Sequence, residues 1–349
     1  MSATRLTPRE RAGLPLEYVR TVGPLTGVTA ERLRSALTGL HRADPAHRAV
    51  ARLDRAGARW WQLDAAGFAR HAAGLVTDLG PDLVDFEATT RRLQDEPHGD
   101  FPMRVLAGGG YVAVRVSQAY GDATSANALI RELVRAAGEG RAARPARFEP
   151  ASWWTRLGTH PGRWREELGF TRPPRRAPEP VRPWRPALTL CSARSSRVLG
   201  EMRPWRDAYS PGISTPAIML AAFTAALSEL GLAPGPAPEP AAGRVLPRRP
   251  EPYPEEIAAQ PRPRIVLADP GWHDPLAGLP WGVEPVGRIN LSVPAYCEPE
   301  DIVLSAGELD GVLHLNATFH ATAYQPGVVR RALDLVCSDP AGLIMAPVS

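Results

Sequence analysis

Three polar residues, Ser117, Gln118 and Asp122, lie where a predicted strand gives way to a predicted helix. Residues 111–116 alternate with the period of a strand, and their three valines share one face. Gln118 continues the valine face, so we expect its side chain to point where the core points. A carboxamide at the mouth of a turn is therefore the first candidate for chemistry in this chain.

The carboxamide of Gln118 can donate and accept hydrogen bonds, and can hold a nucleophile in place. It cannot take a proton, because it has no pKa near neutrality. Ser117 is a weaker candidate, since alternation turns it to the other face and no histidine and aspartate stand near it in sequence. Asp122 is expected to be structural, because a carboxylate in such a turn tends to pair with an arginine. A catalytic role for Asp122 is the alternative.

A second candidate surface comes late in the chain, within residues 309–324. His314, Asn316, Thr318 and His320 alternate there with apolar residues, which predicts a strand with one polar face. We expect this face to be a solvated side of a sheet. The alternative gives His314 and His320 a role in a cleft.

Other elements must position these residues. Residues 29–40 form an amphipathic pattern that begins at Thr29 as N-cap, and residues 86–94 predict another helix. After the turn, Thr124 or Ser125 is expected to cap the helix that follows, and Thr215 to cap a later one. The proline-rich run 171–186 favours a stiff extended connector, because proline lacks an amide donor.

The segment Ser117-Gln118-Ala119-Tyr120-Gly121-Asp122-Ala123 resembles the HHxxxDG signature of the superfamily that contains condensation domains and chloramphenicol acetyltransferase. Of the motif residues, the aspartate is retained. The stretches 25–53, 98–106, 186–230 and 287–336 resemble further parts of that family. This resemblance places Arg48 and Arg104 near Asp122 as candidate partners.

The resemblance implies an α/β fold of two chloramphenicol-acetyltransferase-like lobes, with mixed sheets, flanking helices and a central cleft. We expect an N-terminal lobe over residues 1–172, a proline-rich linker over 173–186, and a shortened C-terminal lobe over 187–349. Gln118 is expected at the floor of the cleft, in the place of the catalytic histidine.

The implied function is acyl transfer or condensation in small-molecule natural-product biosynthesis. The donor would be a thioester on the phosphopantetheine of coenzyme A or of an acyl or peptidyl carrier protein, and the acceptor a small molecule. No other cofactor is implied. The alternatives are a catalytically silent module that binds a carrier protein or recruits a partner enzyme, and a structural subunit of a biosynthetic complex.

Composition argues against several other classes of protein, namely nucleic-acid-binding, disulfide-rich, zinc-binding and membrane proteins. All 41 basic residues are arginines, but they are scattered beside acidic residues, and the net charge is only +4, which argues against a nucleic-acid partner. Cys191, Cys297 and Cys337 lie far apart, which argues against disulfides and a structural zinc site. We found no signal peptide and no apolar run long enough for a membrane span, so we expect a cytoplasmic protein, and a monomer.

Overall fold

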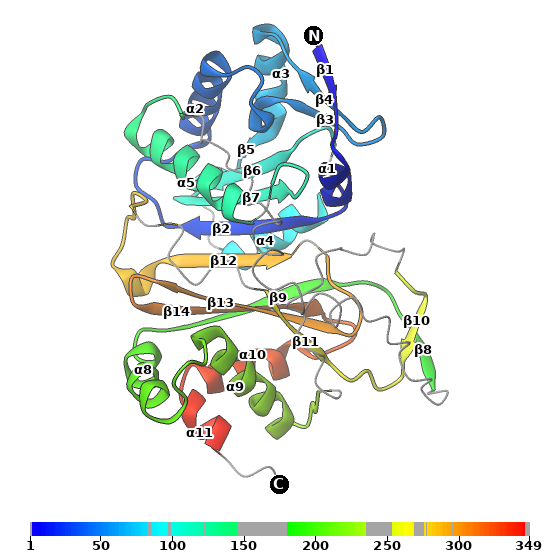
Figure 1. Cartoon of the computed structure of the whole chain (residues 1–349), viewed down its shortest axis with the longest axis vertical. Helices are drawn as coiled ribbons and strands as arrows, with labels where there is room; N and C mark the ends of the chain where they lie inside the picture. The colour runs from blue at the N-terminus through cyan, green and yellow to red at the C-terminus, as the bar shows by residue number, and fades with distance from the viewer. Residues whose placement is uncertain are drawn as a thin grey trace.

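The computed structural model describes residues 2–81, 85–96, 99–121, 123–144, 180–234, 253–268, 276, 278–294 and 296–345. Figure 1 shows two lobes, one above the other, each with a sheet and helices. In the first part of the chain the elements are β1 (Ser2–Arg5), α1 (Pro8–Gly13), β2 (Glu17–Gly23), α2 (Ala30–Ala43), η1 (Arg48–Val50), β3 (Arg52–Asp54), β4 (Arg59–Gln62), α3 (Ala65–Leu75), β5 (Val76–Asp78), α4 (Phe86–Asp95), β6 (Met103–Gly108), β7 (Tyr111–Ser117) and α5 (Ala123–Glu139). The second part contains β8 (Val181–Pro183), β9 (Leu188–Ser195), α8 (Val198–Tyr209), α9 (Thr215–Glu229), β10 (Glu256–Ala258), β11 (Arg264–Ala268), η2 (Pro285–Gly287), β12 (Ile289–Pro294), β13 (Asp301–Leu309), β14 (Val312–His320), α10 (Pro326–Val336) and α11 (Pro340–Met345).

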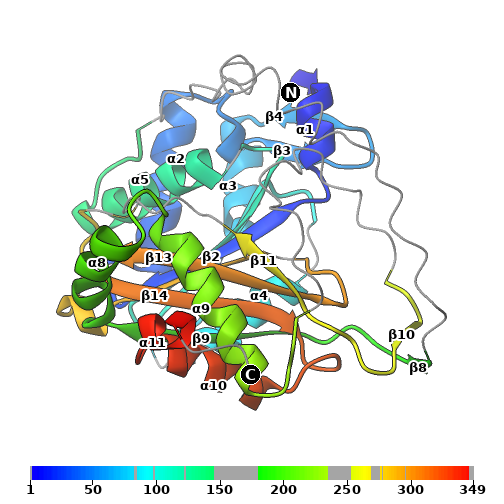
Figure 2. The same cartoon turned by 60° about the horizontal axis from the view of Figure 1, so that its bottom comes forward.

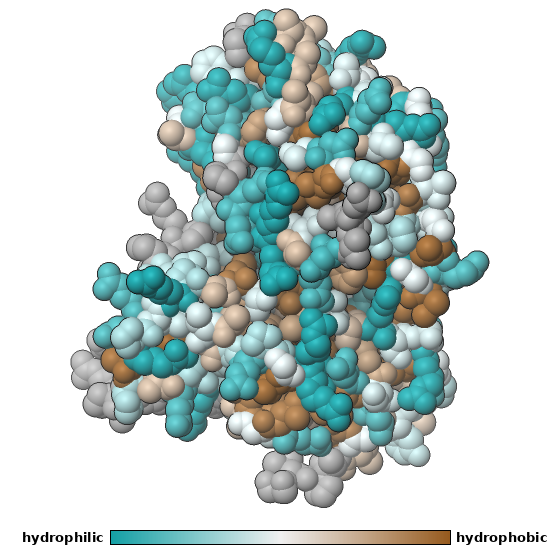
Figure 3. All heavy atoms as spheres, turned by 180° about the vertical axis from the view of Figure 1, so that it is seen from behind, coloured by the Kyte–Doolittle hydropathy of each residue, from teal (hydrophilic) through white to brown (hydrophobic). Residues whose placement is uncertain are grey.

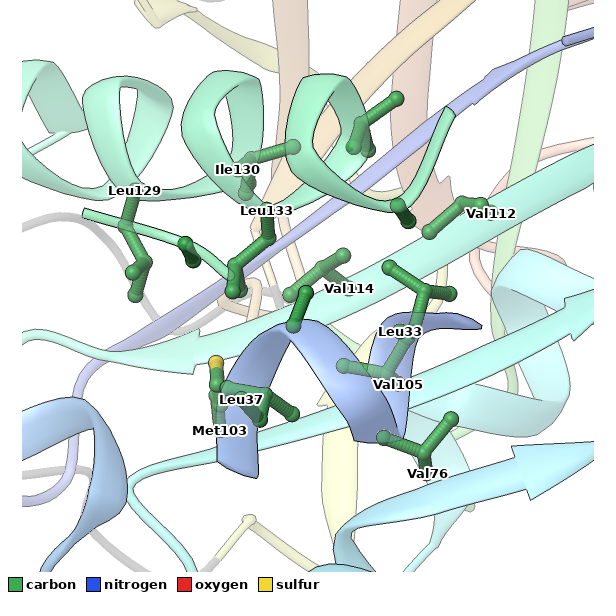
Figure 4. Close-up of a cluster of buried hydrophobic side chains, with 14 of the residues drawn as sticks. Leu33, Leu37, Val76, Met103, Val105, Val112, Val114, Leu129, Ile130 and Leu133 are labelled. Carbon is green, nitrogen blue, oxygen red and sulfur yellow. The ribbon is translucent and has the colours of Figure 1, made fainter. Parts of the chain in front are cut away.

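The first lobe is built on a five-stranded sheet in the order β12-β2-β7-β6-β5, in which only the β5–β6 pair is parallel. One face of this sheet packs against α2 and α5, and Figure 4 shows Leu37 and Leu133 from these helices meeting Val105 and Val114 from the sheet. The other face packs against α4, where Leu93 contacts a smaller apolar cluster. Strand β7 is therefore buried on both faces.

The second lobe contains a four-stranded sheet in the order β11-β13-β14-β9. Its helices α8 to α11 lie on the side away from the first lobe (Figure 1). The core between them includes Phe223 of α9 and Phe319 of β14, both fully buried. The other face of this sheet looks toward the first lobe.

Strand β12 joins the two lobes, because it comes from the second half of the sequence and pairs with β2 in the sheet of the first half. It also lies against β14, so an edge strand of the first lobe's sheet meets the sheet of the second lobe (Figure 1). Figure 2 shows α9 in front of this second sheet, on its other side. The mixed α/β class with two lobes is confirmed. The lobe boundaries at 172 and 186 remain predictions; residues 145–179 lie outside the described chain, and 181–183 form β8.

Several local predictions can be compared directly with the structure. Thr29 caps α2 as expected, accepting a hydrogen bond from the amide of Arg32. Ser214, and not Thr215, caps α9. The predicted cap at Thr124 or Ser125 is wrong, since α5 already begins at Ala123 and both residues lie in its first turn.

The surface seen from behind mixes hydrophilic side chains with separate apolar patches (Figure 3). Within the part of the chain that the structure describes, no helix has both the length and the apolar character needed to cross a bilayer.

Candidate functional site

The signature turn is held rigidly by its backbone. The amide of Gln118 donates to the carbonyl of Leu16 over 2.8 Å, and the amide of Tyr120 donates to the carbonyl of Ser117 over 3.0 Å. Gly13, the last residue of α1, packs so closely that a Cβ there would lie 2.6 Å from the carbonyl carbon of Gln118. The position of residue 118 is thus fixed by Leu16, which directly precedes β2, and by α1, as well as by the strand that ends at Ser117.

The side chain of Gln118 is exposed, so the prediction that it points where the core points is wrong. Strand β7 ends at Ser117, and the strand period does not extend into the turn, where the backbone hydrogen bonds set the direction of each side chain. The neighbouring Ser117 is buried instead, with its side-chain oxygen accepting from the amide of Ala119. A buried, hydrogen-bonded hydroxyl gives no support to Ser117 as a nucleophile.

Asp122 lies outside the described residues, so its contacts and its role remain predictions. The two arginines proposed as its partners each form an ion pair with a different carboxylate. Arg48 forms an ion pair with Glu10, and Arg104 forms one with Glu96 over 2.8 Å.

On the signature strand β7, Arg115 forms a buried ion pair with Glu17 of the adjacent strand β2. Arg55 donates to the same carboxylate over 2.8 Å. Arg115 also donates to the carbonyls of Leu93 and Gln94, at 2.8 and 2.9 Å, and so satisfies the carbonyl end of α4. The adjoining cavity has a volume of about 10 Å³, room for one water molecule, so this cluster is structural.

A second polar network crosses the boundary between β2, α5 and β12. Arg20 is 2% exposed and donates to the amide oxygens of Asn290, at 3.1 and 2.8 Å, and of Asn127, at 3.0 Å. Tyr18 donates to the same oxygen of Asn127 over 3.0 Å. The sequence analysis did not predict this network. Two features of the sequence could have indicated it: an arginine, Arg20, within a strand, and an asparagine, Asn127, on the apolar face of the helix after the turn.

The polar face of β14 is buried and looks toward the first lobe. His314 and Asn316 are each 4% exposed, and Thr318 and His320 are fully buried. The prediction of a solvated sheet face is therefore wrong. Alternation identified the face correctly, but segments from elsewhere in the sequence cover it: β12 lies over Asn316, and the rings of Trp184 and Tyr253 pack against His320.

The two histidines of this face differ in their hydrogen bonds. His320 accepts from the amide of Ala187 at Nδ1, so Nε2 carries the proton that it donates to the carbonyl of Cys297, over 2.9 Å. Both nitrogens are used, so His320 acts as a structural group. His314 has a buried Nε2 without a hydrogen-bond partner in the described chain. Burial, followed by the charges of Arg194 and Arg20, lowers the pKa of His314 to about 4, so its imidazole is neutral at pH 7.

Among the described residues, no group of three or more histidine, cysteine, aspartate or glutamate side chains is arranged to hold a metal ion. The chemistry on offer is therefore that of hydrogen-bonding groups: an accessible amide at Gln118, and buried amides, hydroxyls and a neutral imidazole between the lobes.

Comparisons with known proteins identify the fold. No protein-family model and no curated protein matches the sequence. Among solved structures, the first condensation domain of the CDA synthetase is similar over 99% of both chains, with 13% identity and a TM-score of 0.54. The trichothecene 15-O-acetyltransferase TRI3 from Fusarium sporotrichioides is similar over 97% of this chain and 93% of its own, with 9% identity and a TM-score of 0.56.

The nonribosomal peptide synthetase FmoA3 matches 99% of this chain with 18% identity and a TM-score of 0.52. This chain spans only 43% of the length of that synthetase chain. The resemblance stated from the sequence is thus confirmed at the level of the fold, which is that of condensation domains and related acyltransferases.

Proposed function

We propose that this protein is a divergent acyltransferase or condensation-type protein, which acts on a thioester of coenzyme A or of a carrier protein in small-molecule natural-product biosynthesis. The observation that carries this proposal is the signature turn. It keeps the strand, turn and helix of the family motif, its backbone is fixed from two sides, and it presents the amide of Gln118 to solvent.

In this proposal the amide of Gln118 positions the reacting groups and does not act as a base. The acceptor oxygen or nitrogen attacks the thioester carbonyl, a bond from that atom to the acyl carbon forms, and the carbon–sulfur bond breaks. The acceptor's proton ends on the departing thiolate, which leaves as a thiol. A thiolate can take this proton, so no imidazole is needed for the overall balance.

The test is thioester turnover, measured as release of free thiol from acetyl-coenzyme A and from acylated carrier proteins. Gln118→Ala should lower turnover by roughly ten- to a thousandfold, the range for one well-placed hydrogen bond. Gln325→Ala is the matched control, because Gln325 is also an exposed glutamine but precedes α10, on the helical side of the second lobe. Turnover that survives every substitution at Gln118 would contradict this role.

The second candidate is a catalytically silent module that binds a carrier protein or recruits a partner enzyme. It is favoured by the loss of both signature imidazoles, together with the fully hydrogen-bonded state of His320. Such a module would show carrier-protein binding without turnover, and the binding would weaken on charge reversal of surface arginines and not in Gln118→Ala.

A further inference from the structure

Two buried arginine nitrogens beside the signature strand have no hydrogen-bond partner within the described chain. They are the Nε atoms of Arg55 and Arg104, and both residues line the cavity of about 10 Å³ next to the pair of Glu17 and Arg115. An arginine N–H can only donate, so each of these atoms lacks an acceptor. Native proteins rarely leave buried donors unpaired, because each one keeps the cost of desolvation. We call the cavity with these four residues the arginine pocket.

The carboxylates beside the arginine pocket bind other nitrogens of its arginines. The two oxygens of Glu17 accept from different guanidinium groups, one from Arg55 over 2.8 Å and the other from Arg115. Glu96 accepts from Nη2 of Arg104 over 2.8 Å. Neither carboxylate accepts from the two unpaired Nε atoms, so these donors remain for a ligand.

Positive charge is in excess around the arginine pocket. In the described part of the chain, three carboxylates act on its arginines, namely Glu17, Glu96 and Asp100. The last two each pair with a further arginine, Arg92 for Glu96 and Arg52 for Asp100. Five guanidinium groups therefore share three carboxylates, and a monovalent anion would offset part of the excess.

The electrostatics of Arg55 agree with this excess. Burial lowers the pKa of its guanidinium, and the carboxylate of Glu17 does not restore it, while the like charge of Arg115 lowers it further. The apolar side chains at 101–103 form the rest of the cavity wall. Such a wall screens charges poorly, so an anion in the pocket is attracted more strongly than at the surface.

The volume of the cavity restricts the size of the ligand. About 10 Å³ holds one particle of about the size of a water molecule, whereas phosphate or a carboxylic acid needs more space. A water molecule there would accept from both Nε atoms and leave the excess of positive charge unchanged. A monatomic anion accepts from both donors and reduces that excess.

We propose that the arginine pocket binds one chloride ion, held by the Nε atoms of Arg55 and Arg104. Arg55 also donates to the carbonyl of Leu14 over 2.8 Å. The ion therefore stabilises the segment between α1 and β2, in which the carbonyl of Leu16 holds the amide of Gln118. This inference goes beyond the proposed function and does not depend on it, because it is tested by ion binding and stability alone.

The experiment titrates the full chain with sodium chloride and follows the width of the chloride NMR signal and the melting temperature. Sodium gluconate keeps the ionic strength constant, since its anion is too large for the cavity. Bound chloride should broaden the signal, and a tenfold excess of chloride over its Kd should raise the melting temperature by about 2–4 °C. A melting temperature equal in the two salts, without broadening, overturns the proposal.

Arg104→Met removes one of the two donors and should abolish both the broadening and the rise in melting temperature. Arg288→Met is the matched control, because Arg288, like Arg104, pairs with a carboxylate and lies over an aromatic ring, those of Asp310 and Trp281. The Nε of Arg288 donates to the carbonyl of Val283, so this variant should keep both effects. Equal chloride binding by the two variants overturns the site.

Glu17→Gln gives a second measurement that does not depend on the Arg104 variant. It removes one negative charge from the pocket wall and keeps an amide oxygen for the arginines. Chloride should therefore bind roughly tenfold more tightly than in the wild type. A chloride affinity that is unchanged or lower in Glu17→Gln overturns the proposal, since an uncharged water molecule in the pocket would give that result.

Discussion

The hydroxyl of Ser192 on β9 donates a hydrogen bond of 2.8 Å to the carboxylate of Glu87 on α4. This contact joins the second lobe to the first on the side of the sheet opposite to α5. Arg330 of α10 donates to the other oxygen of the same carboxylate over 3.0 Å. The lobes are thus held together by Glu87 on one side, while the hydrogen bond from Asn316 of β14 to the carbonyl of Asn290 on β12 is long, at 3.5 Å.

Glu87→Ala should destabilise the lobe junction more than Glu87→Gln does. The glutamine keeps a hydrogen-bond acceptor for Ser192 and loses only the ion pair with Arg330. The Arg330 side chain is half exposed, so this ion pair contributes less than about 1 kcal/mol. The alanine also loses the hydrogen bond, for about 1 kcal/mol more in the free energy of unfolding. Urea unfolding measures the difference, with Glu201→Ala, from an exposed pair, as control. An equal decrease in the free energy of unfolding for both variants would show that the hydrogen bond from Ser192 to Glu87 does not stabilise the protein.

Arg115→Met should lower the free energy of unfolding by about 3 kcal/mol. It removes the buried ion pair of Glu17 with Arg115, and it leaves the backbone carbonyls at the end of α4 without their hydrogen-bond donor. Arg135→Met is the control, since the Arg135–Glu139 pair is exposed on a helix and is worth only about 0.3–0.5 kcal/mol. Chemical denaturation gives both values. A loss in Arg115→Met no larger than in the control would contradict the structural role of this cluster.

Stability should fall as the pH drops below 6.5, in part because of His314 and His71. Burial lowers the pKa of each from its ordinary value of 6.5 to about 4. The unfolded chain therefore takes up these protons first, so the contribution is complete above pH 6.5 and is lost as the pH falls toward 4. At pH 5, each of the two histidines should lower the free energy of unfolding by about 2 kcal/mol relative to its value above pH 6.5.

Urea unfolding at pH 7 and pH 5 tests this expectation with His314→Gln. Between pH 7 and pH 5, the free energy of unfolding should fall less in this variant than in the wild type. The difference should equal the contribution of one histidine. An identical pH dependence in the two proteins would mean that His314 is not protonated on unfolding in this range.

Gly13→Ala should disturb the signature turn directly. The new Cβ would lie 2.6 Å from the carbonyl carbon and oxygen of Gln118 and 2.8 Å from the amide of Ala119, and these backbone atoms can only yield by moving α1 or the turn. We expect a lower melting temperature and a loss of thioester turnover of about tenfold or more, since small misplacements of a positioning group are costly.

Gly200→Ala in α8 is the matched control, because nothing lies within 4 Å of its new Cβ. It should leave turnover unchanged and stabilise the helix by up to about 1 kcal/mol. Full turnover in Gly13→Ala would show that the fixed backbone at residue 118 does not matter for the reaction.

The sequence by itself determined the local elements and the overall class. The amphipathic period and N-cap of α2, the strand before the signature turn and the helix after it all follow from residues close together in the chain. The same holds for the polar face of β14, which alternation identified residue by residue. The signature segment also led to the correct fold family, although only its aspartate is kept.

Only the tertiary structure decided which faces are covered and where the turn residue points. Alternation defines two faces of a strand, but the segment that buries a face comes from elsewhere, as β12 does for β14 and α4 does for β7. The side chain of Gln118 is exposed because the hydrogen bond to Leu16 and the packing on Gly13 fix the turn, and both partners lie about a hundred residues earlier in the chain. Contacts of that range leave no periodic trace in the sequence.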